Sequence, residues 1–504
     1  AATSMGAIWS SCSPDFGIKG VMDRFSQIQP KVLFAANGYW FKGKNLGSLD
    51  RIAEIVQQLD TIEKVVIAPY TQQDFDVSGI PRAVKYDDFK AQEDNLDVEF
   101  AQLPFDHPLY IMFTSGTTGL PKCMVQSAGG ILVHHMKELI LHTNLTREDT
   151  IFYFTTCGWM MWNWLVSSLA VGARLLLFDG NPFHPAPGVL WKTAQDEKIT
   201  VFGTSAGYIA ALMNEGVKPG KEYDLSSVKS LLSTGSPLSE EGFEFIYREI
   251  KDDLQLSSIS GGSDINGCFA LGNPMGPVYS GELQCRGLGM KVETFDDNGK
   301  SVINEQGELV CTASEPSMPI YFWNDPDGSR YHDSYFDTYP GIWRHGDWIQ
   351  ITPRGTAIIT GRSDSTINRG GIRMGTSEIY RAVLSLDEIT DALIVDVSGR
   401  PEFPDGWMPL FVVLAPGAQL DQDLITRIAT RVRTDCSPRH VPNEVFAIDE
   451  VPRTMSGKVL EVPVKRILMG QDPDTVLSKG SLANPGALAP FLTMARQLQA
   501  SSPS

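Results

Sequence analysis

Residues 113–130 read FTSGTTGLPKCMVQSAGG, and this stretch decides how the rest of the chain is interpreted. It follows the apolar run 109–113, which predicts a buried strand. A strand that ends in glycines and hydroxyls, with Lys122 close behind, can hold a phosphate through backbone N–H groups and a cation. The alternative is an ordinary strand-to-helix turn. A Walker loop is excluded, because Leu-Pro separates the last glycine from Lys122 and a cysteine follows the lysine.

The composition indicates a large globular protein. A length of 504 residues exceeds the ~250–300 at which single cores stop growing, so two or more domains are expected. The net charge of −18 disfavours nucleic-acid and anionic-membrane partners, and no apolar run is long enough to span a membrane. The seven cysteines are scattered without a C-x-x-C pair, which argues against zinc sites and disulfides and indicates a reducing compartment, the cytoplasm.

The spacing of apolar residues predicts an α/β fold. Short apolar runs alternate with helical stretches such as 186–197 and 206–215, which is typical of sheets covered on both faces. The predicted strands are 31–36, 64–70, 109–113, 174–179, 200–205 and 230–235. After about residue 280 the chain becomes rich in glycine turns, and a β-rich subdomain is expected with strands at 307–314, 348–353 and 357–362.

A second domain is expected to begin near residue 364. Thr376 is a plausible helix N-cap, followed by strands at 391–397 and 410–416 and an amphipathic helix at 422–433. We therefore predict a large N-terminal domain, 1–363, of layered α/β sheets plus the β-rich subdomain, and a small C-terminal α+β domain, 364–504.

Read in full, TSGTTGLPK (114–122) resembles the signature loop of the adenylate-forming superfamily, which contains acyl-CoA synthetases, luciferases and peptide-synthetase adenylation domains. The resemblance implies that Lys122 and the loop grip ATP on the pyrophosphate side. The loop contacts would come from Thr114, Ser115, Gly116, Thr117, Thr118 and Gly119.

Other motifs of the family follow in order. SGGSDING (260–267) is similar to the element that meets the α-phosphate and Mg²⁺, although the family usually has Thr-Glu where this chain has Ser263 and Asp264. A single oxygen ligand plus phosphates suits Mg²⁺. Taken alone, Asp264 could equally cap a turn. The resemblance further implies adenine contacts from Gly235, Ser236 and Pro237, and ribose or phosphate contacts from Asp347 and Arg362.

The resemblance also implies two reactions at one site, with the C-terminal domain rotating between them about Asp364. PRTMSGK (452–458) resembles the loop whose lysine serves adenylation, which makes Lys458 the strongest catalytic candidate. Coenzyme A contacts are implied for Gly371, Arg373 and, from a helix end that is more often simply solvated, Arg433.

The acid is suggested by two regions. The acetate-activating branch has a tryptophan three residues before the acidic metal ligand, where this chain has Gly261, so room for a longer acid is expected. FYFTTCGWMMWNW (152–164), interpreted as a strand, resembles acetoacetyl-CoA synthetases, as do SSCSPDFG (10–17) and SLANPGAL (481–488). Acyl-pocket candidates are Thr155, Thr156, Trp159 and Gly261, although an aromatic run is more often core than pocket.

The sequence therefore predicts an ATP-, CoA- and Mg²⁺-dependent ligase that makes acetoacetyl-CoA, AMP and pyrophosphate through an acyl-adenylate. The alternatives are a short- or branched-chain acyl-CoA synthetase, an enzyme that loads a carrier protein, and an inactive nucleotide-binding relative. The opening AATSMGAIW resembles the middle of a buried helix rather than a signal peptide, so we expect the N-terminal domain to lack its first part.

Overall fold

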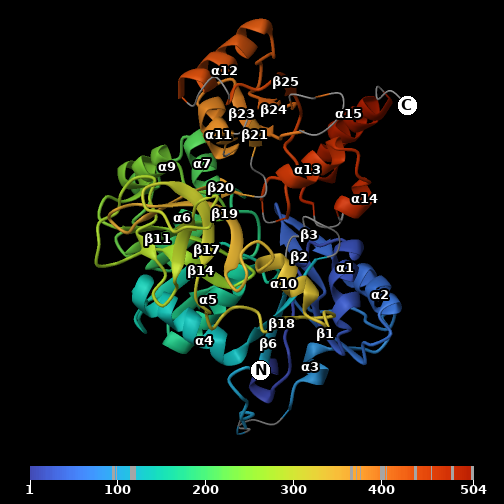
Figure 1. The fold of residues 1–504 in the computed structure, drawn as a ribbon. Coiled ribbons are helices and arrows are strands. Elements are labelled where there is room, and N and C mark those ends of the chain that lie inside the picture. Colours follow the sequence, from blue (N-terminus) through green and yellow to red (C-terminus); the bar gives the residue numbers. More distant parts are fainter. Residues whose placement is uncertain are drawn as a thin grey trace.

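The computed structural model describes residues 1–92, 97, 99–113, 121–363, 367–369, 372–374, 376–397, 403, 406–435, 440–455, 457–477 and 482–500, with the backbone alone at 367–369 and 372–374. Figure 1 shows sheets and helices of the first two thirds of the chain in the lower part of the molecule, and the C-terminal elements above them. Among the described residues, no helix is long and apolar enough to cross a membrane.

A five-stranded parallel sheet forms the centre of the first unit, in the order β12-β11-β10-β8-β9. Alternate residues of its strands point to opposite faces: Phe152 and Phe202 pack with one cluster, and Ile151 and Val201 with another. Helices cover both faces, as predicted. The strands are β8 (Thr150–Tyr153), β9 (Arg174–Leu176), β10 (Val201–Ser205), β11 (Ser230–Thr234) and β12 (Gln255–Ser258), and the helices are α5 (Met160–Val171), α6 (Val189–Asp196), α7 (Ala206–Asn214), α8 (Pro219–Glu222) and α9 (Glu240–Phe245).

The aromatic stretch interpreted as a strand is not one beyond Tyr153. The chain leaves β8 at that residue, and helix α5 starts at Met160. The buried residues of α5, among them Trp164 and Ser168, recur at helical spacing, and Gly172 ends the helix with a φ of 87°. A run that is apolar on every side does not show its period, which explains the wrong assignment.

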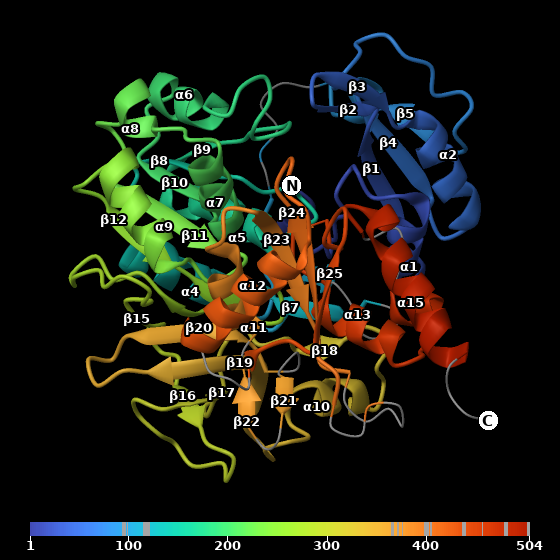
Figure 2. The same ribbon diagram turned by 90° about the horizontal axis from the view of Figure 1, so that it is seen from above.

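A smaller parallel sheet, β1-β4-β5, and an antiparallel sheet, β18-β7-β6, stand beside the first unit (Figure 2). Their strands are β1 (Val32–Ala36), β4 (Lys64–Ala68), β5 (Ala83–Lys85), β6 (Pro108–Phe113), β7 (Cys123–Ser127) and β18 (Tyr321–Phe322); α1 (Ile18–Ile28), α2 (Leu49–Gln58), α3 (Tyr86–Phe89), α4 (Ala128–Met136) and the hairpin β2 (Gly38–Phe41) and β3 (Lys44–Gly47) accompany them. The opening residues correct one expectation. They form a short 3₁₀ turn, η1 (Ala2–Met5), which has no buried residue, and the large apolar side chain of Met5 is exposed to solvent.

The β-rich part comprises two antiparallel sheets, β16-β17-β19-β20 and β13-β14-β15. Their strands are β13 (Ser260–Gly262), β14 (Gly267–Leu271), β15 (Cys285–Arg286), β16 (Val292–Phe295), β17 (Gln306–Cys311), β19 (Trp343–Ile351) and β20 (Ala357–Arg362), with α10 (Ser329–Tyr335) between β18 and β19. The predicted strands at 307–314 and 348–353 are confirmed with shifted ends, and the strand at 357–362 is confirmed with the predicted ends.

The residues from Thr376 onward gather above β19 and β20 in Figure 1 and build their own hydrophobic clusters. A mixed sheet, β23-β24-β25, lies among helices. The elements are β21 (Ile367–Arg369), β22 (Ile372–Met374), α11 (Thr376–Leu384), β23 (Ile389–Ile394), β24 (Pro409–Leu414), α12 (Gln422–Asp435), β25 (Glu444–Ala447), α13 (Glu461–Leu468), α14 (Pro473–Val476) and α15 (Ala489–Ala500). Contacts with the earlier part include Met455, which packs against the cluster around β4, and Arg381, 4.0 Å from Glu240.

Candidate active site

The turn between β13 and β14 carries Ser263 and Asp264, both half-buried. The N–H of Asn266 donates to the main-chain oxygen of Ser263 (3.2 Å), and Asn266 takes a left-handed φ of 46°. The main-chain oxygen of Asp264 accepts a hydrogen bond from Gln126 Nε2 at the end of β7 (2.9 Å). Two elements far apart in sequence therefore meet at this turn.

The Asp264 carboxylate faces a cluster of positive and aromatic groups. The hydroxyl of Tyr335 donates a hydrogen bond to it, and the Tyr335 ring has Lys122 Nζ 4.9 Å from its centroid. Burial raises the pKa of Asp264, but His345, when it is protonated in the acid range, together with the charge of Lys122 and the Tyr335 hydrogen bond, outweighs burial and places that pKa below its usual value. The carboxylate is consequently ionised at neutral pH.

Asp347 and Arg362 are cross-strand partners on β19 and β20. Arg362 Nη1 lies 3.2 Å from Asp347 Oδ1, and His345 Nε2 lies 3.6 Å from Asp347 Oδ2. A Cβ on Gly346, which has a φ of 86°, would come within 3.0 Å of the Arg362 guanidinium. The glycine lets the arginine lie over the strand, so the two predicted ribose contacts are brought together.

His345 connects this pair to the C-terminal loop. Burial lowers the pKa of His345, the carboxylates of Asp347 and Asp264 raise it, and the positive charges of Arg362 and Lys458 lower it further. The result is a pKa below the usual value and a neutral imidazole. Because the Lys458 charge acts on His345, Lys458 lies within electrostatic reach of the ribose pair.

Hydrogen bonds of Arg453 and Thr454 hold the loop that carries Lys458. Arg453 Nη2 lies 2.8 Å from both carboxylate oxygens of Asp391 on β23, and Arg453 Nη1 donates to the Gly457 main-chain oxygen (2.9 Å). The N–H of Lys458 donates to Thr454 Oγ1 (3.1 Å). Gly457 has a φ of 83°, so the turn before the lysine needs a residue without a Cβ.

The predicted adenine contacts follow the end of β11. Gly235 turns with a φ of 92°, and it, Ser236 and Pro237 are exposed. The Thr234 hydroxyl donates to the Ile259 main-chain oxygen (3.0 Å), which ties the end of β11 to the residue before β13. The carboxyl ends of parallel strands meet at one sheet edge, so the residues after β11 begin at the same edge as the chain that leads from β12 into β13.

The acyl-pocket candidates divide into two places. Thr156 Oγ1 lies 2.8 Å from Ser13 Oγ, while Thr155 is buried and Trp159 directly precedes helix α5. Gly261 lies where β13 bulges against β14, and a Cβ there would fall 2.0 Å from the Gly267 main-chain oxygen. Close strand approach therefore explains this glycine without any reference to substrate.

The remaining predicted residues are only partly visible. Thr114, Ser115, Gly116, Thr117, Thr118, Gly119, Asp364 and Gly371 lie outside the described residues. The backbone of Arg373 belongs to β22, and Arg433 is exposed on α12.

Sequence reasoning did not assign a role to Tyr335, His345 or Gln126. His345 lies two residues before Asp347, in the sequence WRHGD (343–347), but the resemblance assigns a role only to the aspartate. Tyr335 had no signal, because a tyrosine in an aromatic helix is typical of core packing. Gln126 could have been suspected, since it is a polar residue in an otherwise apolar strand and is completely buried.

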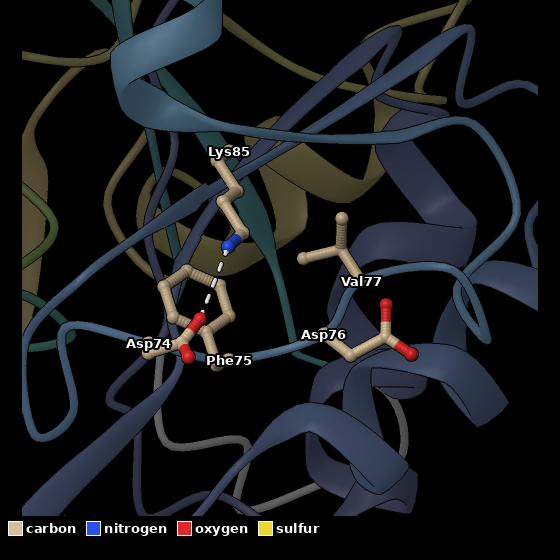
Figure 3. A pocket seen from close by; sticks show the side chains of 5 residues that line it. All are labelled: Asp74, Phe75, Asp76, Val77 and Lys85. Atoms are coloured by element: carbon tan, nitrogen blue, oxygen red, sulfur yellow. Dashed lines mark ion pairs between the residues drawn. The ribbon is translucent and has the colours of Figure 1, made fainter.

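A surface hollow of about 420 Å³ lies elsewhere, lined by Asp74, Phe75, Asp76, Val77 and Lys85 (Figure 3). Lys85 Nζ lies 3.8 Å from Asp74 Oδ1 and 5.0 Å from the centre of the Phe75 ring. The hollow contains none of the predicted site residues, and its lysine is paired.

The chain is similar to known proteins over almost its whole length. Residues 1–322 match the family described as AMP-binding enzyme. Acetoacetyl-coenzyme A synthetase of Rhizobium meliloti is 49% identical over 97% of this chain and 74% of its own length, and acetoacetyl-CoA synthetase of Mus musculus is 47% identical over 97% and 73%.

Two solved structures are similar in fold. Acetoacetyl-CoA synthetase from Streptomyces lividans superposes with a TM-score of 0.92 at 45% identity, covering 98% of this chain and 75% of that one. The anthranilate CoA ligase AuaEII, in complex with anthranoyl-AMP, superposes with a TM-score of 0.74 over 92% and 83%. At 18% identity, this second likeness shows the fold alone.

Proposed function

Since the chain belongs to the AMP-binding enzyme family, we propose that it joins acetoacetate to coenzyme A, with cleavage of ATP to AMP and pyrophosphate. In the first step a carboxylate oxygen of acetoacetate bonds to the α-phosphorus of ATP and pyrophosphate leaves. In the second, the thiol sulfur of coenzyme A bonds to the acyl carbon, AMP leaves and the thiol proton is released.

The observation that carries the proposal is the convergence of charged groups from four distant parts of the chain. One region contains Lys122, which directly precedes β7, Asp264 in the turn between β13 and β14, the Asp347–Arg362 pair, and Lys458. Each of these groups acts electrostatically on another of them or on His345. A protein with a net charge of −18 needs such a local positive region to bind a nucleoside triphosphate.

Each group has a role in adenylation. Lys122 and the loop 114–119 hold the pyrophosphate side, and Asp347 accepts hydrogen bonds from the ribose hydroxyls while Arg362 supports it. Lys458 places its ammonium between the acid and the α-phosphate, where negative charge accumulates in the transition state. Gly235, Ser236 and Pro237 provide the surface for adenine.

Mg²⁺ fits the donor set at Asp264. The described residues contain no group of three or more His, Cys, Asp or Glu side chains that could hold a metal by themselves. Mg²⁺ is commonly bound by one or two carboxylates together with substrate phosphates and water, which is what the ionised Asp264 carboxylate offers. Bound there with ATP, the ion would neutralise phosphate charge, and Ser263 would contact the α-phosphate.

For the second step we assign the C-terminal unit, 364–504, a rotation about Asp364 that withdraws Lys458 and admits coenzyme A along Gly371 and Arg373, with Arg433 as a further phosphate contact. Single hinge residues can absorb such a change in φ and ψ. The acetoacetate preference is supported by the relatives' activity, and Thr155, Thr156, Trp159 and Gly261 are assigned to the acyl side. We place the reaction in the cytoplasm, as part of lipid and ketone-body metabolism.

The test is carboxylate-dependent exchange of labelled pyrophosphate into ATP, with coenzyme A consumption measured in parallel. We expect exchange and thioester formation with acetoacetate above acetate, butyrate and octanoate. Better exchange with another acid makes the chain a synthetase of different specificity. Exchange without coenzyme A consumption indicates transfer to another thiol, and no exchange with any acid leaves a nucleotide-binding relative without this activity.

A further inference from the structure

Three buried side chains from one stretch of the chain hold the backbone of the turn that carries Asp264 and of the start of β14, which follows it. Gln126 Nε2 donates to the Asp264 main-chain oxygen (2.9 Å), and His135 Nε2 to that of Asn266 (2.6 Å). Glu138 Oε1 accepts from the N–H of Cys268 (2.8 Å). Gln126, His135 and Glu138 are completely buried. They lie on β7, on α4 and at the start of the π-helical turn η2 (Lys137–His142).

Each bond has a fixed direction. A main-chain oxygen only accepts, so His135 carries its proton on Nε2. Its Nδ1 lies 2.8 Å from Ser167 Oγ, which also lies 3.0 Å from the Asn163 main-chain oxygen. Burial and the neighbouring His134 lower the pKa of His135 to about 4, so this neutral tautomer persists through neutral pH. His135 therefore acts as a donor of fixed geometry.

Other buried side chains fix the orientation of the Glu138 carboxylate. His134 Nε2 lies 2.7 Å from Glu138 Oε1, Trp164 Nε1 donates to Glu138 Oε2 (2.8 Å), and the other side of the His134 ring bonds to Glu315. A Cβ on Gly267 would fall 2.0 Å from His134 Nε2. The helix thus approaches β14 as closely as a bare backbone permits.

We propose that Gln126, His135 and Glu138 form a positioning clamp that sets the Asp264 carboxylate for the metal-bound nucleotide and couples it to Lys122. The clamp deepens the proposed function and rests on it. The coupling follows from the chain itself: Gln126 is four residues after Lys122, so a shift of β7 moves the loop lysine and the turn together. Such supporting groups matter because they fix where a ligand oxygen stands.

The structure offers a matched control. His142, on the same helical segment, bonds to backbone at both nitrogens, whereas His135 does so only at Nε2. His142 Nδ1 bonds to the Gly272 oxygen (2.8 Å) and its Nε2 to the Leu288 N–H (3.1 Å). It is buried like His135, but it holds the far end of β14 rather than the turn. Replacing either histidine by leucine removes comparable buried bonds, and only His135→Leu releases the turn.

The experiment compares His135→Leu, His135→Gln, Gln126→Leu and His142→Leu in the full chain. Gln126→Leu is a second, independent variant, because it removes one bond to the turn, whereas His135→Leu removes the bond to Asn266 and the contact with Ser167. His135→Gln keeps an amide donor close to the position of Nε2. Thermal unfolding reports the folded fraction of every variant.

The first readout is Mn²⁺ binding by electron paramagnetic resonance in the presence of α,β-methylene-ATP, which cannot transfer its adenylyl group to the acid. The second is the Mg²⁺ concentration for half-maximal pyrophosphate exchange. We expect both constants to rise about tenfold in His135→Leu and Gln126→Leu. His135→Gln should lie nearer the unmodified protein, and His142→Leu should lose stability with unchanged metal constants.

Unchanged Mn²⁺ binding in His135→Leu and Gln126→Leu, or an equal change in His142→Leu, overturns the clamp. Failure of the proposed function looks different, because the unmodified protein then shows no exchange while Mn²⁺ binding with the analogue still separates the variants. If the unmodified protein itself binds no Mn²⁺ with the analogue, the metal role of Asp264 and the clamp are both overturned.

Discussion

The hydroxyl of Tyr335 donates a hydrogen bond to the carboxylate of Asp264, although 71 positions separate the two residues. The Tyr335 ring stacks on Trp343 with 3.6 Å between centroids, so the hydroxyl is delivered by a rigid aromatic pair. The same ring has Lys122 near its centre. One side chain therefore contacts both the predicted metal ligand and the predicted phosphate lysine.

Tyr335→Phe should weaken adenylation while the protein stays folded. Hydrogen bonds to charged groups contribute about 1.5–3 kcal/mol, so kcat/KM for ATP in pyrophosphate exchange should fall about tenfold or more. The pKa of Asp264 should rise, because one group that lowers it is lost, and the acid limb of the exchange rate should move to higher pH. Tyr331→Phe removes a hydroxyl from the same aromatic cluster and serves as the control. Equal effects of the two variants would contradict a specific role.

His134 should make stability depend on pH. Burial alone lowers its pKa, but Glu138 and Glu315 outweigh burial and raise the pKa to about 9, from about 6.5 in the unfolded chain. A raised folded pKa adds stability that is fully present below pH ~6.5 and is lost as pH rises through about 9. We expect the free energy of unfolding in urea to fall from pH 6 to 8.5.

The variant His134→Gln should lose this pH dependence together with about 3 kcal/mol or more, because it removes the cation that lies between the buried carboxylates of Glu138 and Glu315. His332→Gln, at an exposed site, should leave the dependence intact. A pH slope that persists in His134→Gln would assign it to other groups.

We expect Gly261 to be required for the stability of the fold, rather than chiefly for the choice of the carboxylic acid substrate. A Cβ would collide with the backbone of β14, since it would lie 2.0 Å from the Gly267 oxygen. Gly261→Ala should cost about 3 kcal/mol in the free energy of unfolding, whereas Gly47→Ala, with open space around its Cβ, should be nearly neutral. Thermal unfolding, with exchange on acetate and acetoacetate, checks this. A stable Gly261→Ala variant that merely prefers acetate would instead support the pocket interpretation.

The strands could be predicted from the sequence better than the contacts between side chains. β1, β4, β6, β10 and β11 were predicted because continuous apolar runs bounded by turns have few other interpretations. The region around 160–171 was missed because its apolar residues show no period, and only the packing of Trp164 inside the α/β core reveals a helix. The motifs predicted Asp264, Asp347, Arg362 and Lys458 as site residues, which stays a prediction. The Tyr335 contact and the Gln126–His135–Glu138 clamp could not be predicted from the sequence, because they depend on how separate sheets and helices pack against one another.

Arg453 should control how well Lys458 reaches the site. Its contacts with Asp391 and the Gly457 oxygen tie the loop to β23, while the ion pair is about one-third exposed and contributes little to global stability. Arg453→Gln should therefore lower the adenylation rate about tenfold with little change in thermal unfolding, because a misplaced ammonium stabilises the transition state less.

The two half-reactions separate this role from a general defect. Arg453→Gln and Lys458→Ala should both slow pyrophosphate exchange, Lys458→Ala far more, and both should leave coenzyme A attack on supplied acetoacetyl-adenylate nearly unchanged. Arg466→Gln, a change of another arginine in the same C-terminal unit, is the control. If Arg453→Gln slowed both half-reactions equally, the arginine would serve the folding of the C-terminal unit rather than the placement of Lys458, and the loop would have to be held at the site by its other contacts.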